Sequence, residues 1–130
     1  MEPPKNVKVY DLKTSTMWFD EDGIVCSVSK KIPTQTLEDS KKGVEDFKKI
    51  IGNKKVCLLA DVTNSTETTR EVRDYAAVEL PKLVKAVAMI SKSALGRMLA
   101  NMFFSIKEQP YPVKMFSEEA DAKRWLKKFL

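Results

Sequence analysis

The sequence predicts an α/β domain with a mixed β-sheet, in which an antiparallel N-terminal meander is followed by β-α repeats. Two observations predict this class. Three short strand patterns separated by turn residues fill residues 7–29, and after residue 36 helical periodicity alternates with short apolar runs. The length of 130 residues fits one domain over residues 1–130, in which only residues 1–6 allow disorder. The expected order is β-β-β-α-β-α-β-α-β-α.

The antiparallel opening rests on alternation and on one turn. Residues 7–12 (VKVYDL) alternate as a half-buried strand does, and residues 16–19 follow as a second strand. Residues 20–23 (DEDG) end in the Asp-Gly pair that hairpin turns favour. Residues 24–29 then return as the third strand.

The first helix is predicted from its caps and its periodicity. Thr36 is suited to cap its N-terminus, and Gly52 is suited to end it. Its inward positions recur at helical spacing and are Leu37, Val44, Phe47 and Ile51.

An apolar run at residues 56–60 (VCLLA), closed by Asp61, marks the predicted centre of the sheet. A strand without alternation is covered on both faces. Residues 83–90 form a second buried strand whose β-branched and small residues favour a parallel neighbour. Between them, residues 66–80 are predicted as a helix that begins at Thr66, ends before a proline, and faces Val72, Tyr75, Ala76 and Leu80 inward.

The C-terminal part completes the alternation. A third helix opens at residues 91–93 and carries the strongest helical period of the chain. Residues 113–116 follow as a short strand, and Ser117 is expected to cap the last helix. The buried stripe of that helix is Ala122, Trp125, Leu126 and Phe129.

Composition excludes several chemistries. The chain has no histidine, which removes Ser-His-Asp and Cys-His catalysis and histidine-based zinc sites. Cys26 and Cys57 lie inside apolar strand patterns and are expected to be small core residues, because no CxxC or metal-type spacing surrounds them. We therefore expect no catalytic residues, no metal and no cofactor.

Hydropathy and charge bear on location and partners. No apolar run approaches the roughly 20 residues of a membrane span, and the first residues lack a signal-peptide core, so a cytoplasmic protein is expected. Residues 81–130 hold ten basic and four acidic side chains. This excess favours either an anionic partner or solvated helix faces. A nucleic-acid partner is not expected, because the chain has no aromatic-basic motif.

Four segments, together with the element order, carry a family resemblance. They are residues 58–63 (LLADVT), 86–90 (AVAMI), 93–97 (SALGR) and 113–117 (VKMFS), the last followed by Ala122, Trp125 and Leu126. With this order they resemble the STAS superfamily, in its anti-sigma-factor-antagonist-like (SpoIIAA-like) and CRAL-TRIO-like branch. The resemblance implies a non-catalytic module that docks on a protein partner or binds a small ligand.

The loop after the predicted central strand is the first candidate site. It contains Asp61, Thr63, Asn64, Ser65 and Thr66. Ligands of open α/β sheets bind beyond the carboxyl ends of strands, where a helix N-terminus offers free N–H groups. The alternative is a simple helix cap. The resemblance implies a phosphoacceptor at Ser65 or Thr66, although the Asp-Ser-Ser-Gly type of sequence is absent.

Two further candidates lie on the third helix. Lys92, Ser93 and Arg97 at its start suit a phosphate or carboxylate; the alternative is that Ser93 is a plain N-cap and that a glycine after it allows close packing. Farther along, Met98, Met102, Phe103 and Phe104 suit the core, an apolar pocket or a homodimer interface.

The leading functional hypothesis is a regulatory or protein-interaction domain that contacts an unidentified protein partner through the loop after the central strand. The alternative is a carrier or sensor of a small apolar or lipid-like ligand, in a pocket under the third helix. A third class, an acid-base enzyme that uses Asp61, lacks converging residues in the sequence.

Overall fold

A computed structural model describes residues 1–64, 69–106 and 109–130; for Leu99 and residues 102–106 only the backbone is described. The elements follow the predicted order. The strands are β1 (Tyr10–Asp11), β2 (Ser15–Phe19), β3 (Val25–Ser29), β4 (Val56–Asp61), β5 (Val84–Ile90) and β6 (Val113–Phe116). The helices are α1 (Leu37–Ile51), α2 (Arg70–Glu79), α3 (Ala94–Ile106) and α4 (Glu119–Leu126), with short 3-10 turns at Leu80–Lys82 and Lys127–Phe129.

The six strands form one sheet in sequence order, from β1 at one edge to β6 at the other. The pairs β1–β2 and β2–β3 are antiparallel, whereas β3–β4, β4–β5 and β5–β6 are parallel. In the register of the centre, Leu59 lies between Cys26 on β3 and Ala88 on β5. The predicted mixed sheet, its antiparallel opening and the interior position of the 56–61 strand are confirmed.

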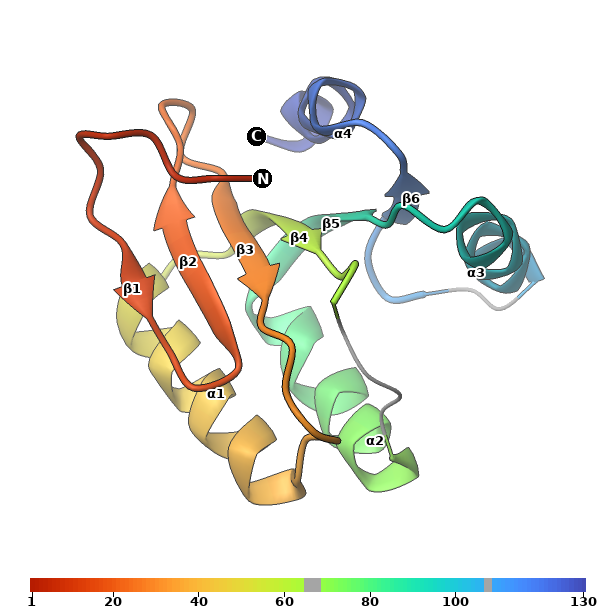
Figure 1. Ribbon diagram of the computed structural model, residues 1–130, viewed down its shortest axis with the longest axis horizontal. Helices are drawn as coiled ribbons and strands as arrows, with labels where there is room; N and C mark the ends of the chain where they lie inside the picture. The colour runs from red at the N-terminus through yellow and green to blue at the C-terminus, as the bar shows by residue number, and fades with distance from the viewer. Residues whose placement is uncertain (65–68, 107–108) are drawn as a thin grey trace.

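Helices cover both faces of the sheet and one edge of it. In Figure 1, α1 and α2 lie side by side below the sheet and α4 lies above it. Helix α3 lies beside β6, at the edge of the sheet. The sheet therefore has two separate cores, one under α4 and one under α1 and α2.

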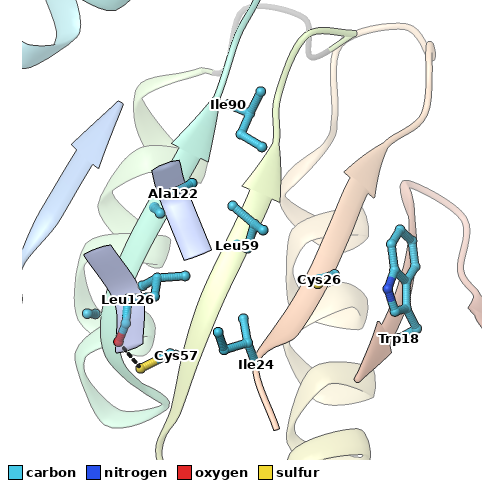
Figure 2. Packing of buried hydrophobic residues seen from close by; sticks show 10 residues of the cluster. Trp18, Ile24, Cys26, Cys57, Leu59, Ile90, Ala122 and Leu126 are labelled. Atoms are coloured by element: carbon cyan, nitrogen blue, oxygen red, sulfur yellow. Dashed lines mark hydrogen bonds between the residues drawn. The ribbon is translucent and has the colours of Figure 1, made fainter. Parts of the chain in front are cut away.

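The α4-face core consists of residues with almost no exposed surface. Leu59, Ile24 and Leu126 are completely buried in it, and Trp18 closes it on the β2 side (Figure 2). The thiol of Cys57 lies 3.8 Å from the carbonyl oxygen of Leu126, so the helix end rests on β4. Met1, in the N-terminal segment, also packs against this core.

The α1/α2-face core is smaller and is bordered by half-buried side chains. Its buried members are Val25, Phe47, Leu83, Val84 and Val87. Helix α1 is fixed by a capping box, in which the Thr36 hydroxyl accepts the Asp39 N–H and the Asp39 carboxylate accepts the Thr36 N–H. The predicted bounds and cap of this helix are confirmed.

Several predicted boundaries differ from those observed, three of them at a turn or a helix cap. The first strand covers only Tyr10–Asp11 and not residues 7–12, because the chain turns at once into β2 through a bond from the Leu12 N–H to the Ser15 carbonyl. Helix α2 begins at Arg70 and not at Thr66, since the Thr69 hydroxyl accepts the Val72 N–H and so fixes the start.

The last helix also begins one residue later than predicted. Its N-cap is Glu118, without a side-chain capping bond, and Ser117 lies outside the helix. The acidic first turn, with Glu119 and Asp121, stabilises the start through the helix dipole. In the described ranges, no helix has both the length and the apolar character that a membrane span requires.

Candidate functional site

The loop after β4 begins with a buried carboxylate. Asp61 pairs with Val28 on one side and Ile90 on the other, and the Val62 N–H donates to the Ile90 carbonyl at 2.9 Å. The Asp61 side chain shares a face with Leu59, on the α4 side of the sheet. Asp61 is therefore the last residue of an interior strand, and its carboxylate lies at the edge of the sheet where the parallel strands end.

The Asp61 carboxylate is used to shape the loop. Its Oδ1 accepts the Thr63 N–H at 3.0 Å, which closes a tight turn, and its Oδ2 lies 3.4 Å from the amino group of Met1. Burial raises the pKa of Asp61, but hydrogen bonding from Thr63 and the charge on the Met1 amino group outweigh it and lower the pKa overall. The group is therefore an ionised acceptor at neutral pH.

Two residues beyond this anchor are exposed. Thr63 and Asn64 both face solvent, whereas Ser65 and Thr66, the positional candidates for phosphorylation, lie outside the described residues. Within the described ranges, no group of three or more His, Cys, Asp or Glu side chains is arranged to hold a metal ion. The described part of the loop thus combines one structural carboxylate with two exposed polar side chains.

The start of α3 uses its polar groups internally. The Ser93 hydroxyl accepts the Gly96 N–H at 3.0 Å and so caps the helix. A Cβ on Gly96 would lie only 3.1 Å from that hydroxyl, so the glycine makes room for the cap. Arg97 turns back to the Ser91 carbonyl, while Lys92 is exposed. An anion site at Lys92, Ser93 and Arg97 stays a prediction.

The apolar stripe of α3 is exposed where its side chains are described. Leu95 is 61% exposed and Met98 is 56% exposed, so these two are not core residues. The side chains of Met102, Phe103 and Phe104 lie outside the described residues. The pocket and the homodimer interface predicted on this helix stay predictions.

An asparagine on α3 has a role that the sequence did not suggest. The Asn101 side chain accepts the Met115 N–H at 2.9 Å and donates to the Met115 carbonyl at 3.3 Å. Met115 belongs to the edge strand β6, so the amide of Asn101 satisfies the open side of that strand. One amide within an apolar stripe gives no sequence signal for this contact, because its partner depends on where α3 lies.

The cysteines are core residues, and a buried ion pair lies near one of them. Burial raises the pKa of the Cys26 thiol to about 12, so this thiol stays protonated. Asp20 accepts the N–H groups of Asp22 and Ile24 through Oδ1, while its buried Oδ2 faces Lys123 of α4 at 3.4 Å. The ion pair of Asp20 and Lys123 connects the β2–β3 turn to α4. The protonated thiol of Cys26 is not a reactive thiolate.

The arrangement of the sheet and its helices defines the chain as a SpoIIAA-like fold, the class that the sequence resemblance predicted. The chain is similar to the crystal structure of an uncharacterised protein of the DUF3478 family with a SpoIIAA-like fold from Shewanella loihica PV-4. The two are 16% identical with a TM-score of 0.62, over 97% of this chain and 98% of that one.

The chain belongs to the family described as domain of unknown function DUF7793, whose model matches residues 17–130. It is also similar to a protein with unknown function from Arthrobacter sp. FB24, with 28% identity over 85% of this chain and 90% of that chain and a TM-score of 0.32. No curated protein matches the sequence.

Proposed function

We propose that this chain is a non-catalytic regulatory domain that contacts a protein partner through the loop between β4 and α2. The SpoIIAA-like fold fits a regulatory or interaction domain. The observation that carries the proposal is the contrast at the carboxyl end of β4. A buried Asp61 accepts the Thr63 N–H at the start of the loop, and Thr63 and Asn64 next to it face solvent.

The chemistry of this loop suits contact better than catalysis. The Asp61 carboxylate is occupied by the Thr63 N–H, and the chain has no histidine to act with it as a general base. The turn that this hydrogen bond fixes at Thr63 loses little entropy when a partner binds, which favours recognition. The carrier function predicted under α3 stays an alternative, because most side chains that would form its pocket lie outside the described residues.

A comparison of pull-downs tests the proposal. The whole chain is used as bait, as wild type and as Ser65→Asp, Thr66→Asp and Asn64→Lys variants. The control is Thr34→Asp, an exposed substitution in the loop before α1. A partner recovered by wild type and control but lost by the three loop variants supports the contact. If all three variants retain every recovered partner, the loop is not the contact surface.

A further inference from the structure

A hollow lies between the helix pair and the sheet. It measures about 200 Å³ and opens to the surface. The turn before β2, the β2 and β4 strands, the loop before α1, both helices and the 3-10 turn after α2 contribute to it. The lining residues are Thr14, Ser15, Met17, Gln35, Ser40, Gly43, Val44, Phe47, Leu58, Ala76 and Leu80.

The hollow has a polar end and an apolar body. Ser15 and Ser40 are 8% and 7% exposed, and they come from different elements, β2 and α1. Within the described residues neither hydroxyl has a hydrogen-bond partner, and both oxygens are accessible to water. Both therefore have free hydrogen-bonding capacity toward the hollow, because serine donates one bond and accepts two.

Helix α1 is shaped to leave this space empty. Its inward stripe carries bulky Val44 and Phe47 in one half but Ser40 and Gly43 in the other. A glycine within a helix makes the helix less stable than alanine would. A Cβ on Gly43 would meet no atom within 4 Å, so close packing does not require glycine there. Gly43 therefore lowers the stability of the helix without improving its packing, and it leaves room beside the helix for a ligand.

The lining also defines the charge of the occupant. None of the residues that line the hollow is ionisable. A charged ligand would lose its hydration without gaining a counter-charge, which costs far more than burying a neutral group. Two ion pairs flank the hollow in sequence, Lys13 Nζ to Asp39 Oδ1 at 2.7 Å and Lys48 Nζ to Glu79 Oε1 at 3.2 Å, and the charges in both are already paired.

We infer that this hollow is a binding site for a small neutral molecule with an apolar body and one hydrogen-bonding end. The apolar body contacts Met17, Val44 and Leu58, and the polar end bonds to the hydroxyls of Ser15 and Ser40. The volume sets the size, because an apolar cavity of about 150 Å³ holds benzene. A ring or a short alkyl chain with one hydroxyl or amide fits.

The test uses benzyl alcohol as the probe and benzoate as its charged counterpart, with backbone amide chemical shifts as the readout on the whole protein. Benzyl alcohol at millimolar concentration is expected to shift the amide signals of Ser15, Ser40, Gly43 and Leu58. Benzoate is expected to bind at least about tenfold more weakly. No shift with benzyl alcohol, shifts that map to another surface, or equal binding of benzoate would each overturn the inference.

Variants of α1 make the test specific. Gly43→Leu fills the hollow and is expected to weaken benzyl alcohol binding at least about tenfold, while Lys41→Leu, on the exposed side of the same helix, leaves it unchanged. Ser40→Ala removes one hydroxyl and is expected to weaken binding about three- to tenfold. Should Gly43→Leu fail to fold, Gly43→Ala gives the same direction with a smaller factor. Unchanged affinity in both Gly43→Ala and Ser40→Ala would show that the hollow is not the site.

Discussion

The two faces of the sheet are built on opposite plans. One short helix, α4, covers one face together with the N-terminal segment, and Ala86 and Ala88 on β5 and Ala122 on α4 let helix and sheet approach closely. Two longer helices, α1 and α2, cover the other face and leave a hollow of about 200 Å³. Small residues thus have opposite effects on the two faces. On the α4 face they permit contact, and on the α1/α2 face they keep a space open.

The α4 face of the sheet therefore contributes mainly to stability, and the α1/α2 face contains the inferred binding site. Among the described residues the α4-face core is the larger one, with ten buried members against five on the α1/α2 face. On the other face, two of the most buried polar residues, Ser15 and Ser40, point to unfilled volume. In a core that is packed to crystal-like density, any change in side-chain volume strongly changes the free energy of unfolding. In a hollow that solvent reaches, the same change has a small effect. Of the four predictions below, the first two test this contrast directly.

The largest effect is expected from two neighbouring leucines on β4. Leu59 is completely buried under α4, whereas Leu58 faces the hollow and is half-buried. We expect Leu59→Ala to lower the free energy of unfolding by about 3–5 kcal/mol and Leu58→Ala by about 1–2 kcal/mol. Urea denaturation of both variants measures this. Equal losses would mean that the two faces are packed alike.

The second prediction adds volume to both faces. Ala122→Leu inserts a larger side chain into the filled α4 face and is expected to cost about 1–3 kcal/mol. Gly43→Ala adds a methyl group where nothing lies within 4 Å, and it is expected to be neutral or to stabilise by up to about 1 kcal/mol. Thermal unfolding followed by circular dichroism distinguishes the two signs. Destabilisation by Gly43→Ala would show that the hollow is not open in solution.

The third prediction concerns the carboxylate at the end of the filled face. Asp61→Ala removes the acceptor of the Thr63 N–H and is expected to cost about 1 kcal/mol at neutral pH. Because the pKa of Asp61 is lowered in the folded state, its contribution is complete above the ordinary value of 3.8 and is lost as the pH falls through the folded-state pKa.

Urea midpoints measured at neutral pH and at about pH 3 check the stability loss and its pH dependence. The difference in urea midpoint between wild type and Asp61→Ala is expected to be smaller at the lower pH. Glu21→Ala, which removes an exposed carboxylate in the β2–β3 turn, is the control for general acid effects. A gap that stays constant across the range would mean that the Asp61 carboxylate does not stabilise the loop through its charge.

Much of this architecture follows from the sequence, because it depends on local signals. The capping box at Thr36 and the apolar run ended by Asp61 each specify an element without reference to distant residues. The start of α2 was misplaced because Thr66 and Thr69 are equally good caps by type, and only the Thr69 bond to Val72 decides between them.

The hollow and the role of Asn101 were beyond sequence reasoning for a different reason. Helical periodicity places Val44 and Phe47 of α1 on the inward stripe. It says nothing about Ser40 and Gly43, whose role becomes clear only when α2 and β2 lie opposite them. Likewise, the period of α3 identified an apolar stripe without showing what covers it. Such features depend on how elements meet, which local patterns do not encode.

The smallest effect is expected on α3, which lies at the sheet edge and belongs to neither face. Met98 is 56% exposed, so Met98→Ser is expected to change the free energy of unfolding by no more than about 0.5 kcal/mol. Urea denaturation at two protein concentrations measures the change. A loss above about 1 kcal/mol that grows with protein concentration would contradict this expectation. It would show that a second copy of the chain covers Met98, and α3 would then be a homodimer interface.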